Sequence, residues 1–291
     1  MNQVKDQNNN GDIMPLESSV LTVPLRRTMA RRNILITGGL GGIGRRVYEL
    51  YSNVLPDAHF IVADLEGERA EAFRDKNPAA QFLSVDFLDA TSIDHFINQV
   101  STGEPLTDLI AVHGGVGNTE WETKQRSDSL TAEQMVYLNL TSVVLLLGGL
   151  LDRRLLVGTA DNHGTATCIS SCNRFGGFRS EPYSAAKSGL LGAVREFAAT
   201  RGAKSAVRVN MVTPGTVIDT WARGPREKMQ QIASGMPIGR YAHANDIATT
   251  ILMLTEQMIA VTGQEIVVDG GQLLVRVTPR KVAEVAAMMK E

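Results

Sequence analysis

The 291-residue sequence predicts an α/β fold in which helices cover both faces of one parallel β-sheet. Short β-like runs alternate with helix-like stretches from Arg32 onward. Runs such as Ile34–Ile36 and Ile266–Val268 are continuously apolar, as expected for strands that are buried on both sides. The predicted strands lie near residues 33–37, 59–63, 81–85, 108–112, 164–169, 205–212 and 265–268. We therefore expect a Rossmann-type doubly wound parallel sheet of about seven strands in a single domain.

The domain is predicted to cover residues 31–272. Residues 1–30 begin with an Asn- and Gln-rich stretch and contain Pro15 and Pro24, which predicts a disordered or loosely packed N-terminal extension. Residues 273–291 form a C-terminal extension whose last part has helix-forming composition. We expect this tail to be a short helix on its own subunit or a contact with a partner subunit. Neither repeats nor a linker that would separate a second domain are visible.

Composition narrows the function classes. A formal net charge of −2 gives no electrostatic footprint for nucleic acid or for an anionic membrane surface. The run Val143–Leu151 is short of the roughly 20 apolar residues that span a bilayer, so no membrane association is expected. Cys168 and Cys172 have no second pair to complete a zinc site, and they form no disulfide framework. The start does not resemble a secretory signal, so we expect a cytoplasmic protein without a metal site.

A glycine-rich turn, residues 37–44, follows the first predicted strand and precedes a helix-like segment. Glycines there permit a tight turn, and the free N–H groups at the start of the helix stabilise a negatively charged group. Asp64 ends the next strand, about 20 residues further on, where an acid can accept hydrogen bonds from an adenosine ribose. This arrangement predicts a dinucleotide site.

The sign of the charge at Asp64 bears on the choice of dinucleotide. A carboxylate there repels a 2′-phosphate, and the turn residues Gly39–Gly41 offer no compensating base, so NAD(H) is favoured over NADP(H). Arg45 and Arg46 lie just beyond the turn and could soften this preference.

Tyr183 and Lys187 are four residues apart, which places both side chains on one face of a helix. A phenol titrates near ~10 unaided, and a nearby cation lowers its pKa toward the range in which it exchanges protons with an alcohol or ketone. Ser170 and Ser171 follow the strand-like run 165–169, so a hydroxyl is presented at the carboxyl end of a strand. We interpret the tyrosine as a general acid/base and a serine as the group that orients the substrate oxygen.

In this order, the turn, the acid, the serine pair and the Tyr/Lys pair resemble a short-chain dehydrogenase/reductase of the classical type over residues 31–272. The resemblance implies that Asn139 completes a proton relay with Ser171, Tyr183 and Lys187. It also implies a set of cofactor-binding residues: Thr37, Gly38, Leu40, Gly42, Ile43, Gly44, Asp64, Leu65, Asp86, Phe87, His113, Gly114, Gly115, Tyr183, Lys187, Pro214, Gly215, Thr216, Val217 and Thr220. Of these, Asp86 and Phe87 are expected to meet the adenine, and the segment from Pro214 to Thr220 the nicotinamide.

Two departures from the family pattern stand out. Where the family reads Asn-Asn-Ala-Gly, this chain has Val112-His113-Gly114-Gly115, and we interpret His113 as a histidine satisfied by backbone rather than a catalytic one. The serine register is also open. The family's usual separation from the tyrosine leads to Ser170, whereas alignment of the strand leads to Ser171; successive strand residues face opposite sides, so only one reaches the site. We favour Ser171 and keep Ser170 as the alternative.

The resemblance implies an NAD-dependent oxidoreductase that transfers hydride between a nicotinamide and a secondary alcohol or ketone. Two alternatives remain: a non-catalytic nucleotide-sensing or scaffold protein, and an epimerase or tailoring enzyme that uses transient oxidation. Residues 216–240 correspond to a lid that sets the substrate, and they mix apolar with cationic side chains. The family also implies a homo-oligomer, a tetramer or a dimer.

Overall fold

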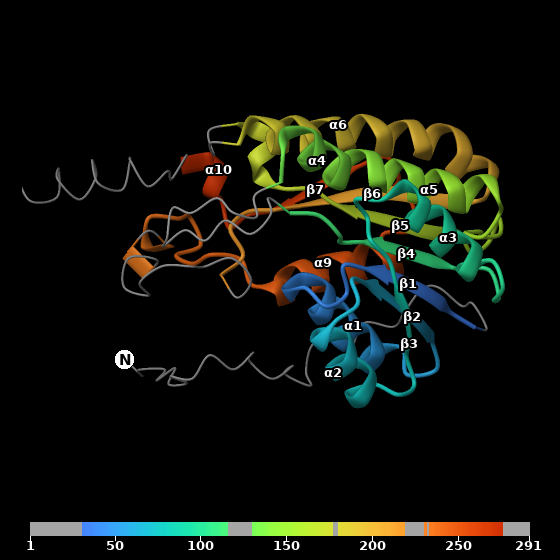
Figure 1. Ribbon diagram of the computed structural model, residues 1–291. Helices are drawn as coiled ribbons and strands as arrows, with labels where there is room; N and C mark the ends of the chain where they lie inside the picture. Colours follow the sequence, from blue (N-terminus) through green and yellow to red (C-terminus); the bar gives the residue numbers. More distant parts are fainter. Residues whose placement is uncertain (1–30, 116–129, 177–179, 219–229, 232, 276–291) are drawn as a thin grey trace, which may run out of the picture.

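The computed structural model describes residues 31–115, 130–176, 180–218, 230–231 and 233–275. A seven-stranded, all-parallel sheet in the order β3-β2-β1-β4-β5-β6-β7 forms its centre (Figure 1). The strands are β1 (Asn33–Thr37), β2 (His59–Asp64), β3 (Gln81–Ser84), β4 (Asp108–Ala111), β5 (Gly164–Ile169), β6 (Val207–Pro214) and β7 (Glu265–Val268). The predicted Rossmann-type, doubly wound fold in a single domain is confirmed.

Helices cover the two faces of the sheet. The described helical segments are α1 (Gly42–Val54), α2 (Glu68–Lys76), α3 (Ala90–Val100), α4 (Ala132–Val136), α5 (Ser142–Asp152), α6 (Glu181–Phe197), α9 (Ala244–Glu256) and α10 (Gln272–Val275). A π-helical turn, Tyr137–Thr141, joins α4 to α5, a second one, Ala198–Gly202, continues α6, and a 3-10 turn, Cys172–Phe175, follows β5. Figure 1 shows α3, α5 and α6 on one face of the sheet and α1 and α9 on the other.

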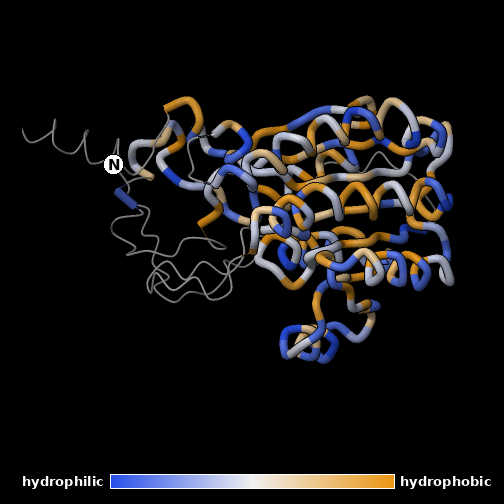
Figure 2. Tube along the Cα trace, turned by 45° about the horizontal axis from the view of Figure 1, so that its top comes forward, coloured by the Kyte–Doolittle hydropathy of each residue, from blue (hydrophilic) through white to orange (hydrophobic). Residues whose placement is uncertain are grey.

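The side chains of each strand alternate between two separate cores. Leu35 of β1 packs with α3, α5 and α6, whereas its neighbours Ile34 and Ile36 pack with α1 and α9. Both faces are therefore apolar, which explains the continuous apolar runs in the sequence. Apolar stretches accordingly run along the strands and the helices beside them (Figure 2).

Some predicted strand limits were wrong. β6 runs from Val207 to Pro214 rather than over 205–212, because Ala206 adopts a left-handed conformation (φ 52°) that ends the preceding turn just before the strand. β4 ends at Ala111 and β3 at Ser84, one residue earlier than predicted, while β2 extends to Asp64. Of the predicted extensions, only residues 273–275 lie within the described part of the chain, as the end of α10.

The segment Ala132–Asp152 is long and apolar enough to cross a membrane by length and composition, with a mean hydropathy of 1.7. Half of that window is buried within the domain, where Leu146, Leu147 and Leu150 belong to the core. A core helix of a globular domain passes the same test, so this segment is weak support for a membrane span.

Candidate active site

The glycine-rich turn joins β1 to α1 at the carboxyl edge of the sheet, where β1 lies beside β4. Gly38 has φ +65°, and a Cβ there would lie 2.7 Å from the backbone N of His113. A Cβ on Gly44 would lie 2.1 Å from the carbonyl O of Gly38. A side chain is thus excluded at Gly38 and at Gly44, which explains these two glycines.

The start of α1 suits an anion. Its N-cap, Gly41, supplies no side-chain cap, and its first turn holds no acidic residue, so the N–H groups of Gly42, Ile43 and Gly44 sit at a positive helix end without a competing carboxylate. These residues fit the pyrophosphate of a dinucleotide, as the sequence predicts.

Asp64 ends β2 beside this turn. Its Oδ2 accepts a hydrogen bond from the Leu40 N–H at 2.9 Å, and its Oδ1 accepts one from the Leu65 N–H at 2.8 Å. A carboxylate offers about four acceptor positions, so both oxygens keep room for a ribose hydroxyl. The Leu65 side chain is 58% exposed, so its backbone is the part fixed beside the acid.

The two arginines after the turn point elsewhere. Arg46 is buried against α9, with its Nε 3.3 Å from Asn245 Oδ1 and its guanidinium 3.2 Å from Glu49. Arg45 pairs with the same Glu49 at 3.9 Å. Arg46 is thus held away from Asp64, while the half-exposed Arg45 has only a long contact with the carboxylate that Arg46 also uses.

Asp86 and Phe87 follow β3, and their side chains lie in different environments. Asp86 is exposed, and its carboxylate accepts a hydrogen bond from the Leu88 N–H at 2.8 Å. The Phe87 ring is buried and stacks on His113 with centroids 3.6 Å apart. Because its ring is buried, Phe87 can contact the adenine only through its backbone. The prediction for Phe87 is therefore restricted to a backbone contact.

Tyr183 and Lys187 lie on α6, whose N-terminus faces the carboxyl end of β5. The Lys187 Nζ is 5.7 Å from the centroid of the Tyr183 ring and donates to the carbonyl O of Ile169 at 2.9 Å. Lys187 is 2% exposed, so its ammonium is held in a fixed position within the fold.

The two serines face different ways, as alternation along a strand requires. Ser171 lies at the Tyr183 side chain, and its Oγ donates to Asn173 Oδ1 at 3.3 Å and accepts from the Asn173 N–H at 3.2 Å. Ser170 is 3% exposed and donates to the carbonyl O of Lys187 at 3.2 Å. The geometry favours Ser171 as the serine at the tyrosine and makes Ser170 a tie to the backbone of α6.

The electrostatics of this group differ from the prediction. Burial raises the pKa of Tyr183 to about 12, the neighbouring Ser171 hydroxyl acts in the opposite sense, and Lys187 does not contribute to the shift. Burial also lowers the pKa of Lys187 to about 8. The expected lowering of the phenol pKa by the ammonium is thus absent, because loss of water around the buried ring outweighs a cation that sits over the ring face.

Asn139 lies in the π-helical turn and reaches across to the loop after β4. Its Nδ2 donates to the carbonyl O of Gly115 at 2.7 Å and to that of Met135 at 2.9 Å, and its Oδ1 accepts from the Gly115 N–H at 2.9 Å. A Cβ on Gly114 would lie 2.6 Å from Asn139 Oδ1 and 3.1 Å from Lys187 Nζ. Gly114 therefore lets Asn139 and Lys187 approach the same loop, and both Gly114 and Gly115 take left-handed φ values of +142° and +151°.

His113 is held by side chains, so the prediction that backbone satisfies it was wrong. Its Nδ1 lies 2.6 Å from Thr37 Oγ1, and its Nε2 lies 3.1 Å from Ser142 Oγ. Sequence reasoning could not find these partners, because they come from β1 and α5, which approach β4 only in the folded sheet. Thr37 is buried beneath the glycine-rich turn.

The segment after β6 is tied to α10. The Thr216 N–H donates to Gln272 Oε1 at 2.9 Å, and Gln272 Nε2 donates to Thr216 Oγ1 at 3.1 Å. Gly215 approaches Asp269 so closely that a Cβ would lie 2.8 Å from its Cα. Pro214 is the last residue of β6, and Val217 pairs with Ala242. Gln272 is a residue that sequence reasoning missed; Thr220 and the rest of residues 219–229 of the expected lid lie outside the described residues.

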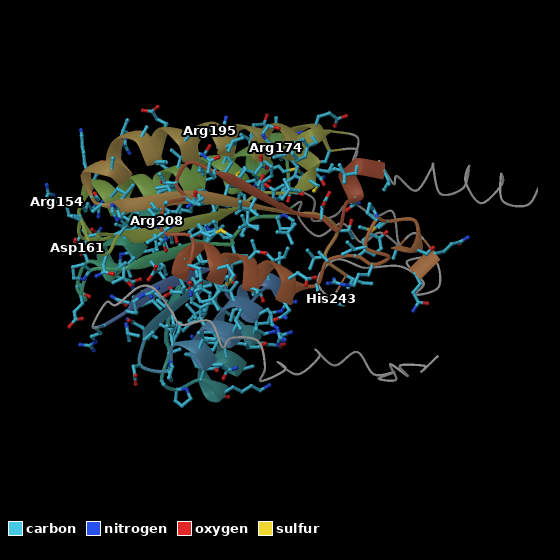
Figure 3. All side chains as sticks on the ribbon, turned by 180° about the vertical axis from the view of Figure 1, so that it is seen from behind. Arg154, Asp161, Arg174, Arg195, Arg208 and His243 are labelled. Atoms are coloured by element: carbon cyan, nitrogen blue, oxygen red, sulfur yellow. The ribbon has the colours of Figure 1, made fainter. Side chains whose placement is uncertain are left out.

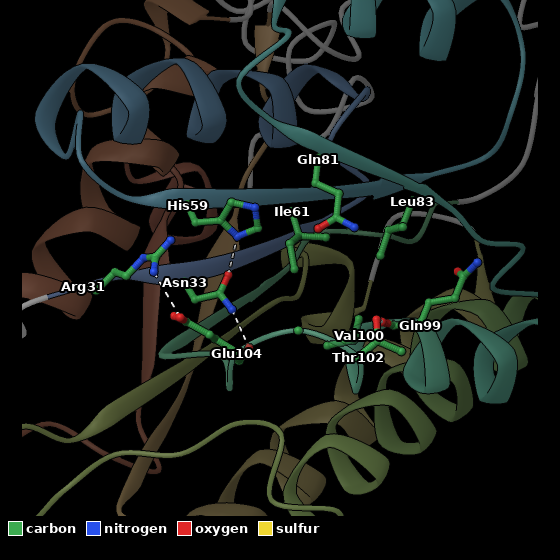
Figure 4. A pocket seen from close by; sticks show the side chains of 11 residues that line it. Arg31, Asn33, His59, Ile61, Gln81, Leu83, Gln99, Val100, Thr102 and Glu104 are labelled. Atoms are coloured by element: carbon green, nitrogen blue, oxygen red, sulfur yellow. Dashed lines mark hydrogen bonds and ion pairs between the residues drawn. The ribbon is translucent and has the colours of Figure 1, made fainter.

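A separate cavity of about 220 Å³ lies at the opposite, amino edge of the sheet (Figure 4). The polar side chains on its wall bond to one another: Arg31 pairs with Glu104 at 3.0 Å, and His59 Nδ1 lies 2.9 Å from Asn33 Oδ1. Figure 3 shows the two ends of the sheet, with Arg154 and Asp161 toward the amino edge and Arg174 after the carboxyl end of β5. The cavity therefore belongs to a different end of the molecule from Tyr183.

Among the described residues, no group of three or more His, Cys, Asp or Glu side chains could hold a metal ion. Cys168 and Cys172 are buried free thiols, and burial raises the pKa of each to about 12. Such thiols stay protonated and unreactive near neutral pH.

The parallel sheet and the glycine turn at its carboxyl edge define a Rossmann-type, nucleotide-binding class of protein. Residues 41–272 match a family model described as enoyl-(acyl carrier protein) reductase. The chain belongs to the short-chain dehydrogenase/reductase family, whose members are oxidoreductases that use a nicotinamide cofactor on small-molecule substrates.

Relatives match over most of their length. An uncharacterized short-chain type dehydrogenase/reductase, y4mP, from Sinorhizobium fredii is 30% identical over 80% of this chain and 93% of that protein. The (2S)-[(R)-hydroxy(phenyl)methyl]succinyl-CoA dehydrogenase subunit BbsD from Thauera aromatica is 27% identical over 84% and 97%. The solved structure of a Pseudomonas aeruginosa RhlG/NADP active-site complex superposes with a TM-score of 0.70 at 22% identity, over 86% of this chain and 98% of that one.

Proposed function

We propose that this protein catalyses hydride transfer between NAD(H) and a secondary alcohol or ketone, with Tyr183 as the general acid/base. The observation that carries the proposal is the grouping of the Ser171 hydroxyl, the Tyr183 phenol and the Lys187 ammonium at the carboxyl edge of the sheet, the edge that also holds the glycine-rich turn before α1. A bound nicotinamide supplies the hydride donor or acceptor at its C4 carbon. The protein supplies positioning, a proton and a hydrogen bond to the substrate oxygen.

Each side chain has a distinct role in this proposal. Ser171 orients the substrate oxygen toward the Tyr183 hydroxyl, beside which it lies. Tyr183 gives its proton to that oxygen during reduction, since the phenol is protonated at neutral pH. Lys187 holds a positive charge beside the phenol and is the group placed to bind the nicotinamide ribose. Asn139 fixes the Gly114–Gly115 loop that Lys187 also approaches.

We infer a preference for NAD(H) from the charges around Asp64. Its carboxylate lies at the turn, while Arg45 and Arg46 are paired with Glu49 and directed into α1 and α9. A 2′-phosphate would meet the negative charge of Asp64, and the buried Arg46 is turned toward α9. Solved relatives that are titled as NADP or NADPH complexes share the fold at 22–23% identity, which bears on architecture and not on this choice.

A spectrophotometric screen at about 340 nm tests the proposed function, because the reduced nicotinamide ring is consumed or formed in every net turnover. The panel includes simple ketones, secondary alcohols, carboxylated cyclohexanols and 3-oxoacyl thioesters, the last two suggested by the names of relatives. We expect turnover with at least one substrate and a kcat/KM for NADH at least about tenfold above that for NADPH. Cofactor binding with no turnover on any substrate would favour a nucleotide-sensing protein or an epimerase.

Variants of two nearby acids isolate the charge at the turn. Asp64→Ser is expected to narrow the difference between NADH and NADPH, because it removes the carboxylate that repels the 2′-phosphate. Glu66→Ser is the control, since Glu66 is exposed and pairs with Arg74 at 2.6 Å instead of facing the turn. An unchanged cofactor ratio in the Asp64 variant would contradict the inferred preference.

The lowered pKa of Lys187 predicts a pH dependence. The ammonium is charged below about pH 8 and neutral above it, whereas Tyr183, with a pKa of about 12, stays protonated across this window. In ketone reduction we expect kcat/KM for NADH, which reports the free enzyme, to be level near pH 6–7 and to fall as pH rises through about 8.

The Lys187→Arg variant is the control for this profile. A guanidinium stays charged throughout, so the decline near pH 8 should disappear even if the overall rate is lower. A level profile to pH 9.5 in the unmodified protein, or the same decline in the arginine variant, would count against Lys187 as the titrating group.

A further inference from the structure

His113 occupies the place of a family asparagine and joins three parts of the fold through its ring. The side chain is 5% exposed, and its two nitrogens meet Thr37 Oγ1 at 2.6 Å and Ser142 Oγ at 3.1 Å. Phe87 stacks on the ring at a centroid distance of 3.6 Å and an interplanar angle of 10°. The two nitrogens of the imidazole and one face of its ring are thus in contact with three different parts of the fold.

The hydrogen-bond partners define which nitrogen carries the proton. The Ser142 hydroxyl donates its single proton to the carbonyl O of Leu138 at 2.7 Å, so toward His113 it can only accept. Nε2 must therefore be protonated, and Nδ1 accepts the proton of the Thr37 hydroxyl. Burial, reinforced by the charge of Lys187, lowers the pKa of His113 to about 3, so the ring is neutral at physiological pH.

The two hydroxyl partners lead to different halves of the candidate active site. Thr37 is the last residue of β1, directly before Gly38, and the backbone of His113 itself closes over Gly38. Ser142 begins α5, three residues after Asn139 in the π-helical turn. Asn139 in turn bonds both backbone groups of Gly115, two residues after His113.

We propose that His113 is a positioning residue that sets the cofactor turn and the Asn139–Lys187 group at a fixed separation, through one hydrogen bond to each side. The inference rests on the proposed function, since it assigns the two bonds to cofactor binding and to proton transfer. The Nδ1–Thr37 bond holds the turn that receives the pyrophosphate. The Nε2–Ser142 bond holds the helix from which Asn139 reaches the loop beside Lys187.

Two substitutions separate these bonds. His113→Asn keeps an amide near the position of Nδ1 and loses the link to Ser142; we expect the KM for NADH within about twofold and kcat lowered about tenfold or more. His113→Gln places its amide near the position of Nε2 and loses the link to Thr37; we expect the KM for NADH raised about tenfold, with kcat changed less than about threefold. His59→Gln at the amino edge of the sheet is the matched control and should leave both constants unchanged.

A merely structural histidine predicts a different outcome. Both variants would then lose thermal stability and active protein to a similar degree, lowering kcat together with no change in the KM for NADH, and that result would overturn the proposal. An unmodified enzyme without turnover overturns the proposed function itself, and this is known before any variant is compared.

The protonation of the ring offers a readout that needs no turnover. In ¹⁵N-labelled protein, long-range ¹H–¹⁵N correlations are expected to show His113 with a protonated Nε2 and a bare Nδ1 from pH 6 to 8. A ring protonated at Nδ1, or at both nitrogens, would overturn the proposed bridge, even if the variants failed to fold.

Discussion

Replacing Tyr183 with phenylalanine is expected to lower kcat by about 10³-fold, within the range of 10²–10⁴ that a positioned general acid contributes. The substitution removes one oxygen, beside which Ser171 lies, and keeps the ring over which Lys187 lies. Binding of NADH should change little, because the glycine turn and Asp64 are untouched. The assay is NADH oxidation with the best ketone of the screen, together with NADH affinity by fluorescence.

Tyr137→Phe is the matched control for this experiment. Tyr137 lies two residues before Asn139 in the π-helical turn, and its hydroxyl is buried without a hydrogen-bond partner among the described residues. Deleting that hydroxyl should therefore leave kcat near the value of the unmodified enzyme. Full activity in the Tyr183 variant would remove the proposed general acid, while equal losses in both variants would indicate an effect on folding.

Replacing Arg32 with methionine is expected to reduce the free energy of unfolding by about 3–5 kcal/mol, the cost of breaking a buried ion pair on one side. The Arg32 guanidinium lies between two buried carboxylates, with Nε 2.9 Å from Asp108 and Nη2 2.7 Å from Glu256. Without the cation, two negative charges remain close together at the amino edge of the sheet. Urea unfolding at pH 7 measures the loss.

The neighbouring arginine provides the control. Arg31 pairs with Glu104 at 3.0 Å, but the two side chains are 67% and 64% exposed, so Arg31→Met should cost less than about 1 kcal/mol. If the two variants lost similar stability, the buried carboxylates would not depend on Arg32. A further check is pH: the deficit of the Arg32 variant should shrink as pH falls, because protonation neutralises the carboxylates left behind.

The apolar runs and turn glycines of the sequence predict the fold well because such local patterns recur in successive strand–helix units. Apolar runs such as Ile34–Ile36 must be buried on both faces, and the glycines of the turn before α1 mark the strand-to-helix change. These signals depend on neighbours in the chain, which a sequence displays directly. The limits of β6 were wrong because Ala206 takes a left-handed conformation that no local pattern announces.

The candidate site likewise has features that the sequence predicts and features that only the folded structure shows. Residue types at fixed spacing, such as Tyr183 and Lys187 on one helical face, could be chosen from sequence, and their catalytic roles stay predictions. The pKa of Tyr183 could not be predicted from the sequence, since it depends on how far the folded protein excludes water from the ring. Arg32 with its two carboxylates was missed because Asp108 and Glu256 lie far from it along the chain.

By itself, the sequence determined the class of fold, the position of the nucleotide turn and the set of side chains available for chemistry, because periodicity and spacing are properties of neighbouring residues. Only the tertiary structure decided which serine meets Tyr183, what holds His113 and which way Arg46 points. Each of those outcomes depends on contacts between strands and helices that are distant in the chain, and such contacts exist only once the sheet has assembled.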